Sequence, residues 1–422
     1  MQKTFLFLQG PHGPFFKEMG LSLKADEHRV VRVNFNGGDW IDWSGVGAVN
    51  FKGKQQEWLD YVVYLFKRDK VTDLVLFGDC RSLHQIAIGE AEKKQIRVHV
   101  FEEGYIRPNW ITYEKGGVNG NSTLFNDWDS NDSLDVENEE ETSKKVGPSM
   151  RWILFYCLRY YFFKSLWFFR FRHYTRHRPY RPLQELLLWI GNLLHMPLLN
   201  MRSNKRREDL FKKDSSFYLV CLQLDSDAQL RIHSKYLSMA DFINEVLRSF
   251  AAHAPKDCLL VFKKHPFDPG AIPYETLVRL EAYSLGIRDR ILFLHSGSLP
   301  ELIKESVGVV LMNSTVGTSA IHHGKPTIAL GTAIYDMEGL TWQGKLKDFW
   351  QGVDRPDMNL YKKFRSYLMK EALVNGGFYT SLGRQLAIKG CISRMLSERS
   401  RKKEASGNNV IPMKKNGTWN DA

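Results

Sequence analysis

Two adjacent glutamates, Glu102 and Glu103, follow the apolar run VHVF and precede a glycine. Two carboxylates held close together repel each other, which raises the pKa of one of them. A carboxylate in that state can take a proton from an attacking hydroxyl group, as a general base does. The pattern does not distinguish Glu102 from Glu103, and a pair of solvated turn residues explains it equally simply.

A second pair of acids, Asp225 and Asp227, follows the run YLVCL, with Gln223 just before it. Alternate residues of an extended strand point to the same side, so both carboxylates can serve one site. Such a pair can hold a divalent cation under a nucleotide diphosphate, or one aspartate can attack an anomeric carbon as a nucleophile. A helix N-cap with a solvated neighbour is the structural alternative.

Three cationic side chains, Lys263, Lys264 and His265, end the run that begins LLVF and are followed by Pro266. Their charges predict a cationic mouth for a phosphate at the end of a strand. The proline fixes the direction in which the loop leaves that strand and removes one hydrogen-bond donor. Taken alone, a His-Pro pair is common and indicates little.

A polar turn, Asn313, Ser314 and Thr315, follows the run VGVVLM and opens the predicted helix TVGTSAIHH. Hydroxyl groups and unpaired backbone N–H groups at a helix start bind phosphate well, although a plain N-cap needs no ligand. We interpret His322 and His323, at the far end of that helix, as partners of the helix dipole rather than as metal ligands.

The elements that must position these residues are short β-rich runs that alternate with helical patterns. This is the pattern of parallel sheets, whose functional residues gather at the carboxyl ends of the strands. We therefore predict an α/β fold with two Rossmann-like domains that face each other across a cleft. The runs are 4–9, 28–35, 73–79 and 97–104 in the first half, and 216–227, 258–268, 291–297, 307–315 and 326–331 in the second.

Almost all of the excess positive charge lies in one segment. The chain has a formal net charge of +12, and residues 151–207 hold 12 Lys or Arg against the single acid Glu185. Residues 151–174 also contain 12 aromatic side chains. Rings with interleaved cations suit the headgroup layer of an anionic membrane, so we predict docking at a lipid surface.

Two other interpretations of this segment stay open: a buried aromatic helix with solvated arginines, and a site for single-stranded nucleic acid. No RNA-binding or DNA-binding motif accompanies it, and we expect no nucleic acid. The apolar stretch from Leu186 to Met201 contains Pro197 and is too short to span a bilayer, so we predict a second interfacial or core helix.

The remaining composition limits the class of protein. Five scattered cysteines without a CxxC pair exclude a disulfide scaffold and a zinc ribbon, and they fit a reducing cytoplasm. The N-terminal run TFLFLQ is interpreted as a strand rather than a signal peptide. Residues 127–141 contain eight acids and predict a solvated loop, and the C-terminal residues predict a polar, mobile tail.

The order of the motifs, acidic-acidic-Gly, then His-Pro, then Ser-Thr, resembles that of bacterial GT-B transferases that use CMP-activated sugars. The longer segments are similar to those of capsule-polysaccharide β-Kdo transferases of the KpsS/LipB type, from about residue 4 to about residue 390. These segments are QGPHGPFF, FGDCR, FEEGYIRPNWIT, QLDSDAQLRIHS, KKHPFDPG and NSTVGTSAIHHGKPTIALG.

The resemblance implies transfer of Kdo from CMP-Kdo to phosphatidylglycerol or its lyso form, which starts the poly-Kdo linker of an exported capsule. It also implies retention of the anomeric configuration, and therefore a carboxylate nucleophile and an acid/base group, as in retaining glycosidases. A monophosphate leaving group needs no metal, so we expect neither a metal nor another cofactor.

Mapped onto this sequence, the resemblance implies Asp227 as the nucleophile, with Asp225 as the alternative, and Glu103 or Glu102 as the base for the acceptor. His265 would stabilise the departing phosphate. The predicted donor-binding residues are Gln223, Lys263, Lys264, Pro266, Asn313, Ser314 and Thr315. The predicted contacts for the acceptor or the sugar carboxylate are Gly10, His12, Gly13 and Arg107.

These roles give four predicted regions. Residues 1–150 form an acceptor-side domain with an acidic loop at 126–145, and residues 151–210 form the membrane-docking segment. Residues 211–396 form the CMP-sugar domain, and residues 397–422 form the tail. We expect a cytoplasmic protein, peripheral on the inner membrane and in contact with other capsule synthesis or export proteins. A transferase for another CMP-sugar and a non-catalytic assembly protein remain the alternatives.

Overall fold

The computed structural model describes residues 2–45, 47–126, 128, 143–174, 182–213, 215–224, 230, 232–268 and 270–397 of the 422-residue chain. The chain divides into two compact units. The first unit comprises Met1–Asp127, Ser133–His177 and Arg365–Asn409, and the second comprises Trp128–Asp132, Arg178–Phe364 and Val410–Ala422. Each unit contains a largely parallel sheet, so the predicted α/β fold with two Rossmann-like sheets, as in the GT-B class, is confirmed.

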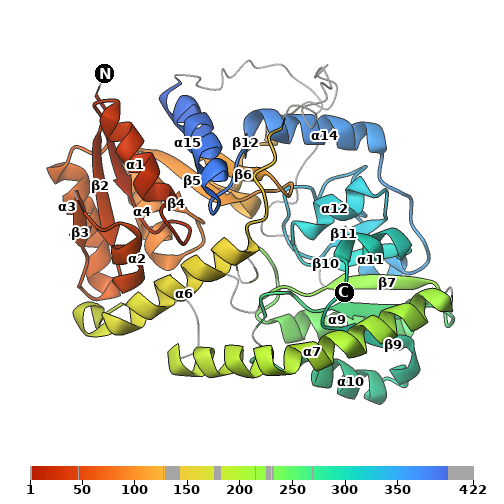
Figure 1. The fold of residues 1–422 in the computed structure, drawn as a ribbon. Coiled ribbons are helices and arrows are strands. Elements are labelled where there is room, and N and C mark those ends of the chain that lie inside the picture. The colour runs from red at the N-terminus through yellow and green to blue at the C-terminus, as the bar shows by residue number, and fades with distance from the viewer. Residues whose placement is uncertain are drawn as a thin grey trace. The chain divides into compact units, whose positions relative to one another are not determined.

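The first unit is built on a seven-stranded sheet with the order β12-β6-β5-β4-β1-β2-β3 (Figure 1). Strands β1 to β5 are parallel, whereas β6 runs antiparallel to both β5 and β12. The strands are β1 (Thr4–Phe7), β2 (Arg29–Asn34), β3 (Ala48–Asn50), β4 (Asp73–Phe77), β5 (Arg97–Glu103), β6 (Trp110–Lys115) and β12 (Leu373–Asn375).

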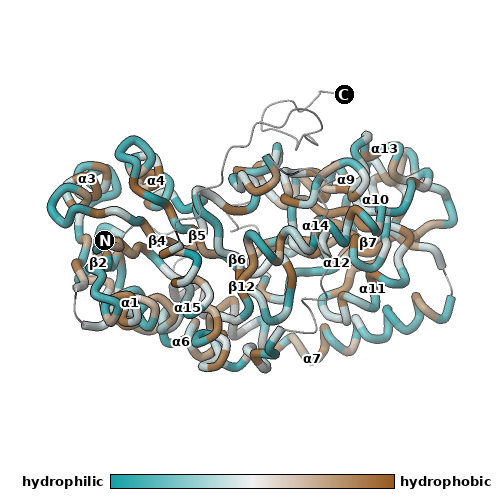
Figure 2. The backbone as a smooth tube through the Cα atoms, turned by 90° about the horizontal axis from the view of Figure 1, so that it is seen from above, coloured by the Kyte–Doolittle hydropathy of each residue, from teal (hydrophilic) through white to brown (hydrophobic). Residues whose placement is uncertain are grey.

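Helices cover both faces of this sheet because alternate strand residues enter different cores. Leu6 packs with residues of α3 and α4, whereas Phe5 and Phe7 pack with residues of α1 and α15. Figure 2 shows the apolar strands between helices whose outer sides are hydrophilic. The helices are α1 (Phe15–Ala25), α2 (Gly37–Asp42), α3 (Trp58–Arg68), α4 (Ser82–Lys93), α6 (Met150–Leu166) and α15 (Ser381–Leu396), with 3-10 turns η1 (Gln55–Glu57), η2 (Asn119–Asn121) and η3 (Phe168–Phe171).

The second unit has a five-stranded parallel sheet with the order β11-β10-β7-β8-β9. Its strands are β7 (Phe217–Cys221), β8 (Leu259–Lys263), β9 (Ile291–Leu294), β10 (Gly308–Leu311) and β11 (Thr327–Ala329). Its helices are α7 (Pro182–Lys212), α9 (Met239–His253), α10 (Tyr274–Ser284), α11 (Leu299–Glu305), α12 (Val316–His322) and α13 (Leu346–Phe349), with the 3-10 turn η4 (Arg288–Arg290). Helix α14 (Met358–Glu371) carries the chain back to the first unit.

Side-chain caps fix where several helices begin. The side chain of Asn36 accepts hydrogen bonds from the backbone N–H groups of Gly38 and Asp39 at the start of α2. Ser238 and Asp241 form a capping box at the start of α9, in which each side chain accepts from the other residue's N–H group. These caps satisfy donors that the first helical turn leaves without a partner.

The basic aromatic segment forms two helices, α6 in the first unit and α7 in the second. The predicted helix over Leu186–Met201 lies within α7, and Pro197 stands inside it. Figure 2 shows that α7 changes along its length from apolar to hydrophilic residues. No helix in the described part of the chain combines the length and apolarity needed to cross a bilayer.

The boundaries of the compact units differ from the predicted ones. The predicted second domain, 211–396, loses its C-terminal part, because β12 pairs with β6 and α15 packs on α1 in the first unit. The predicted separate segment 151–210 is divided between the units. Pairing between residues so far apart leaves no trace in local sequence patterns. Of the predicted acidic loop, 126–145, residues 127 and 129–142 lie outside the described residues, as does the predicted tail from residue 398 onward.

Candidate functional site

The two glutamates predicted as alternatives for the general base end strand β5 of the first sheet. Glu102 is paired with Thr112 and Glu103 with Ile111 on β6, so consecutive side chains leave opposite faces of the strand. The backbone N–H of Glu103 donates to Oε1 of Glu102 at 3.0 Å, and Oε1 of Glu103 accepts from the Tyr379 hydroxyl at 3.0 Å. The two side chains therefore point to opposite faces of β5, and each carboxylate accepts from a different donor; their roles stay predictions.

Tyr379 is a candidate site residue that the sequence patterns did not indicate. Desolvation, followed by the nearby charge of Glu103, raises its pKa well above the usual value for tyrosine. The hydroxyl therefore stays protonated and donates a hydrogen bond to the Glu103 carboxylate. Tyr379 stands 276 residues after Glu103, between β12 and α15, so no local spacing connects the two residues.

Arg107, a predicted contact for the acceptor or the sugar carboxylate, is exposed and lies in the loop that follows β5. Its Nε donates to the carbonyl oxygen of Gly104 at 3.4 Å. A Cβ atom on Gly104 would lie 2.3 Å from the carbonyl oxygen of Trp110, so only glycine fits this turn. The turn keeps the guanidinium beside the end of β5, where it can pair with a carboxylate or a phosphate.

The loop after β1 contains Gly10, His12 and Gly13, the other predicted acceptor-side residues. A Cβ atom on Gly10 would lie 2.6 Å from an aromatic ring of α1, and Gly13 has a φ of +110°. The ring of His12 lies 4.2 Å from the ring of Tyr160 on α6, measured between centroids. These contacts give the loop a packed position against α1 and α6, whatever ligand it binds.

Asp42, at the end of α2, joins this loop to α6. Its Oδ2 accepts from the N–H of Gly13 at 2.9 Å, and its Oδ1 accepts from the guanidinium of Arg159. Burial raises the pKa of Asp42 to about 6, although the hydrogen bonds from Gly13 and Arg159 act in the opposite direction. Asp39, three residues earlier, accepts from the Tyr160 hydroxyl at 3.0 Å. The sequence patterns indicated neither aspartate.

The loops predicted to bind the donor meet at one edge of the second sheet. Strand β7 lies between β10 and β8, and the carboxyl ends of parallel strands share an edge. Gln223 follows β7, His265 follows β8 and Asn313 follows β10. Gln223 Nε2 donates to Asn313 Oδ1 at 2.9 Å, and the N–H of Asn313 donates to Gln223 Oε1 at 3.1 Å. Two of the three loops are thus joined directly.

The Ser314–Thr315 turn opens α12, as predicted. The N–H of Val316 donates to the Ser314 hydroxyl oxygen at 3.3 Å. The buried hydroxyl of Tyr335 donates to the carbonyl oxygen of Ser314 at 2.6 Å, and a Cβ atom on Gly317 would lie 2.2 Å from the Tyr335 ring. Tyr335 and Gly317 therefore fix the turn, and the motif itself did not point to either residue.

Lys263 is one of the three cationic residues predicted to bind a phosphate at the end of β8, and the structure differs from that prediction. This residue is the last of β8 and is buried, with its Nζ donating to the carbonyl oxygen of Lys264 at 2.8 Å. Burial lowers the pKa of Lys263. The Nζ of Lys264 lies 3.9 Å from Asp268. Lys263 therefore does not belong to the predicted mouth, and Lys264 and His265 remain its predicted members.

His265 has a defined tautomer in its neutral form. The backbone N–H of Phe267 donates to Nδ1 of His265 at 3.1 Å, so the ring proton resides on Nε2. The adjoining Pro266 is exposed and lies in the turn that follows. This arrangement gives His265 an N–H group that can donate to a phosphate oxygen at the strand end.

Asp225 and Asp227, the predicted nucleophile and its alternative, lie outside the described residues. Among the described residues, no group of three or more His, Cys, Asp or Glu side chains is placed to hold a metal ion. The two aspartates are not part of that set.

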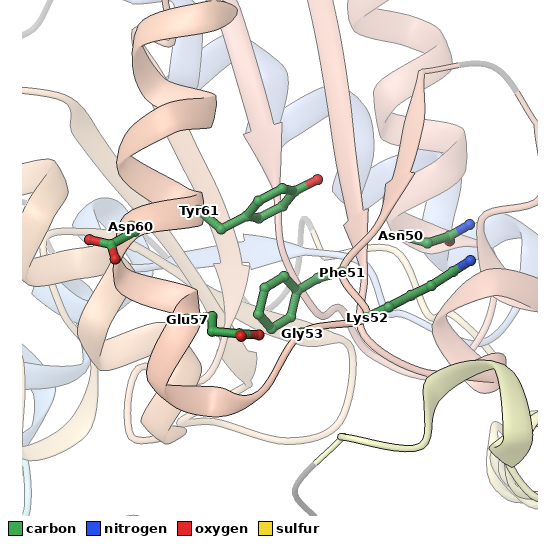
Figure 3. Close-up of a pocket in the computed structure, with 7 residues that line it drawn as sticks. All are labelled: Asn50, Phe51, Lys52, Gly53, Glu57, Asp60 and Tyr61. Carbon is green, nitrogen blue, oxygen red and sulfur yellow. The ribbon is translucent and has the colours of Figure 1, made fainter.

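A hollow of about 410 Å³ opens on the first unit beside β3 and α3, and none of the predicted site residues lines it. Figure 3 shows the rings of Phe51 and Tyr61 close to each other, with Asp60 pointing away from the Phe51 ring. The lining residues are Asn50, Phe51, Lys52, Gly53, Glu57, Asp60 and Tyr61.

Comparisons with known proteins agree with the family resemblance that the motifs indicate. The family described as "Capsule polysaccharide biosynthesis protein" matches residues 72–379. The capsule polysaccharide export protein KpsS of Escherichia coli is 38% identical over 387 residues, which cover 89% of this chain and 97% of that protein. The capsule polysaccharide modification protein LipB of Neisseria meningitidis is 32% identical over 391 residues, covering 90% and 92%. The predicted resemblance to the KpsS/LipB type is confirmed.

Among solved structures, the β-Kdo 2,7 transferase of Thermosulfurimonas dismutans KpsC is similar over 93% of this chain and 100% of that chain, with a TM-score of 0.43 and 15% identity.

Proposed function

The chain belongs to the capsule polysaccharide biosynthesis protein family, and on that premise we propose that it is a glycosyltransferase that moves Kdo from CMP-Kdo to phosphatidylglycerol or its lyso form. The product would start the poly-Kdo linker of a capsular polysaccharide. The observation that carries this proposal is the convergence of the Gln223, His265 and Asn313 loops at one edge of the second sheet.

In the proposed reaction the second unit binds the nucleotide. Ser314 and Thr315 hold the phosphate of CMP-Kdo with their hydroxyl groups, and Lys264 supplies positive charge. Nε2–H of His265 donates to a phosphate oxygen and stabilises the negative charge that grows as CMP leaves. The amide pair of Gln223 and Asn313 supports this role because it fixes the β7 and β10 loops relative to each other.

The first unit supplies the base for the acceptor. Glu103 takes the proton from the glycerol hydroxyl as the oxygen attacks the anomeric carbon. The hydrogen bond from Tyr379 supports Glu103 over Glu102, because it holds one carboxylate oxygen in place and leaves the other oxygen for the acceptor. Arg107 is placed beside this strand end to pair with the carboxylate of the sugar or the phosphate of the lipid.

Retention of configuration requires two displacements. In the first, the carboxylate of Asp227, or of Asp225, attacks the anomeric carbon and CMP leaves. In the second, the acceptor oxygen displaces that carboxylate, and the enzyme is restored. We propose that neither step uses a metal ion, because a monophosphate leaves with less charge to neutralise than a diphosphate. The protein would act in the cytoplasm, peripherally on the inner membrane, beside other capsule synthesis and export proteins.

The test is mass spectrometry of lipids after incubation of the purified protein with phosphatidylglycerol vesicles and CMP-Kdo generated in situ. We expect lipid heavier by Kdo with the wild type, and almost none with His265→Ala, Glu103→Gln or Asp227→Ala. His253→Ala, which replaces an exposed histidine at the end of α9, is the matched control and should retain activity.

Other results would contradict the proposal in identifiable ways. Product only with another CMP-sugar would reassign the donor. No product from any CMP-sugar, together with normal capsule export in cells that carry only the His265→Ala protein, would indicate a non-catalytic assembly protein.

A further inference from the structure

Helix α6 presents two faces in opposite environments. On one face Tyr156 and Tyr160 are buried in the first unit. On the other face every fourth residue is apolar and more than half exposed: Met150, Leu154, Leu158, Phe162 and Leu166. A row of exposed apolar side chains on a soluble protein commonly marks an interaction surface. We name these five residues the outer stripe of α6 and interpret the stripe as a binding surface.

The inner face is tightly fixed, so the outer stripe has a defined orientation on the first unit. A Cβ atom on Gly37 would lie 2.3 Å from the carbonyl oxygen of Phe163, and one on Gly38 would lie 2.5 Å from the Tyr160 ring. Glycines at both positions let the backbone of α2 approach α6 closely. The Arg159–Asp42 ion pair adds a charged contact to the same interface.

The charge around the stripe suits an anionic lipid surface. Residues 150–174 contain five Lys or Arg and no acid, and of these cations Arg159 is engaged by Asp42. Several of the others lie against aromatic rings, with Arg151 over Trp152 at 5.8 Å and Arg170 over Trp167 at 5.2 Å. Exposed rings with adjacent cations are suited to the depth of lipid headgroups, where both the apolar and the charged parts are satisfied.

The other half of the basic segment is engaged differently, although the composition predicted docking for all of it. Arg206 pairs with Glu275 at 2.9 Å, and Arg207 lies 3.5 Å from Glu301. In these contacts two cations of α7 form ion pairs with acidic residues of the second unit. Leu194 and Met201 on α7 are exposed as well, so these two ion pairs do not exclude α7 from a lipid surface. The proposal concerns α6 and the η3 turn after it, where the exposed apolar residues recur at every fourth position.

We propose that the outer stripe of α6 inserts into the interface of an anionic bilayer, so that the first unit takes its acceptor directly from the membrane. This inference rests on the proposed function, because that function requires a lipid acceptor. The structure connects the two directly: the ring of Tyr156 lies 3.1 Å from the Cβ position of Gly13, in the loop predicted to contact the acceptor. The docking helix and the acceptor loop thus lie side by side in the first unit.

Vesicle co-sedimentation tests the proposal with a matched pair of variants. Leu158 on α6 is 59% exposed and Leu21 on α1 is 56% exposed, and both stand on helices of the first unit. We expect Leu158→Glu combined with Phe162→Glu to weaken binding to vesicles of phosphatidylglycerol and phosphatidylcholine by about tenfold or more. Leu21→Glu should bind like the wild type. Equal binding of the double variant and the wild type would overturn the proposal.

A second variant keeps the apolar stripe and removes only exposed charge. Arg151→Gln with Arg172→Gln should weaken binding to vesicles rich in phosphatidylglycerol and reduce its dependence on salt, because charge neutralisation no longer contributes. No binding of the wild type to either vesicle would also overturn the proposal and would assign the stripe to a protein partner.

The assay can also separate failure of this proposal from failure of the proposed function. Transfer of Kdo to a water-soluble, short-chain phosphatidylglycerol does not need docking, so the Leu158→Glu/Phe162→Glu protein should match the wild type there and fail only on vesicles. Equal loss on both acceptors would contradict a docking role. Vesicle binding without Kdo transfer to either acceptor would refute the proposed function, whereas the proposal that α6 docks at a membrane would be retained.

Discussion

Replacing Asp42 by asparagine tests the pKa of a buried carboxylate. This carboxylate joins the end of α2 to Gly13 in the loop after β1 and to Arg159 on α6. Burial raises the pKa of Asp42 from 3.8 to about 6. At 1.36 kcal/mol per pKa unit, this difference corresponds to about 3 kcal/mol of folding free energy. Asparagine keeps an oxygen that accepts from the Gly13 N–H, but it has no proton to release.

The sign follows from the order in which the two states lose their proton. The unfolded chain releases it near pH 3.8 and the folded protein only near pH 6, so the folded state binds more protons between these values. The contribution of Asp42 to stability is therefore complete below pH 3.8 and is lost as the pH rises through 6. The free energy of unfolding of the wild type, minus that of Asp42→Asn, should fall by about 2–3 kcal/mol between pH 4 and pH 7.

Urea unfolding at a series of pH values measures this difference. A protein of two units can unfold in more than one transition, so the transition of the first unit must be identified as the one that Leu6→Ala moves, since Leu6 is fully buried in that unit. Asp60→Asn, at an exposed aspartate of the same unit, is the control and should follow the wild-type profile at all pH values. Parallel profiles for the wild type and Asp42→Asn would refute the reasoning and show that Arg159 outweighs desolvation.

Three further predictions concern the proposed reaction. Tyr379→Phe should lower kcat by about tenfold through loss of the hydrogen bond to Glu103, with KM for the donor unchanged in steady-state kinetics; an unchanged kcat would exclude a positioning role. Gly317→Ala places a Cβ atom 2.2 Å from the Tyr335 ring and should weaken CMP binding by about tenfold or more in calorimetry, whereas Gly191→Ala, with open space around it, should not. Activity should persist in excess EDTA, and a loss that Mg²⁺ restores would contradict the metal-free mechanism.

The strand-end motifs are the part of the candidate site that the sequence predicts well. The runs before Gln223, His265 and Asn313 become β7, β8 and β10, and parallel pairing of these strands brings the following loops to one edge. Apolar periodicity and the turn residues at the ends of the strands carry that information locally. The same reasoning locates Glu102 and Glu103 at the end of β5.

The rest of the site depends on contacts between distant residues or on the direction of a single side chain. Tyr379 meets Glu103 only because the chain returns to the first sheet after the second unit is complete. Lys263 and Lys264 look equivalent in sequence, yet the last residue of β8 is buried and its neighbour is only partly so. The charge count cannot show that Arg159 is matched by Asp42, because the partner lies 117 residues away.

The return of β12 and α15 to the first unit also has a consequence for synthesis of the protein. The ribosome delivers β1 to β6 early, but the strand that pairs with β6 and the helix that covers α1 arrive only with residues 373–396. All five strands of the second sheet lie between residues 217 and 329, so that sheet can form while the first still lacks an edge strand. During that interval β6 is an open edge with part of the core of its unit uncovered, so the nascent chain is exposed to aggregation until α15 has emerged.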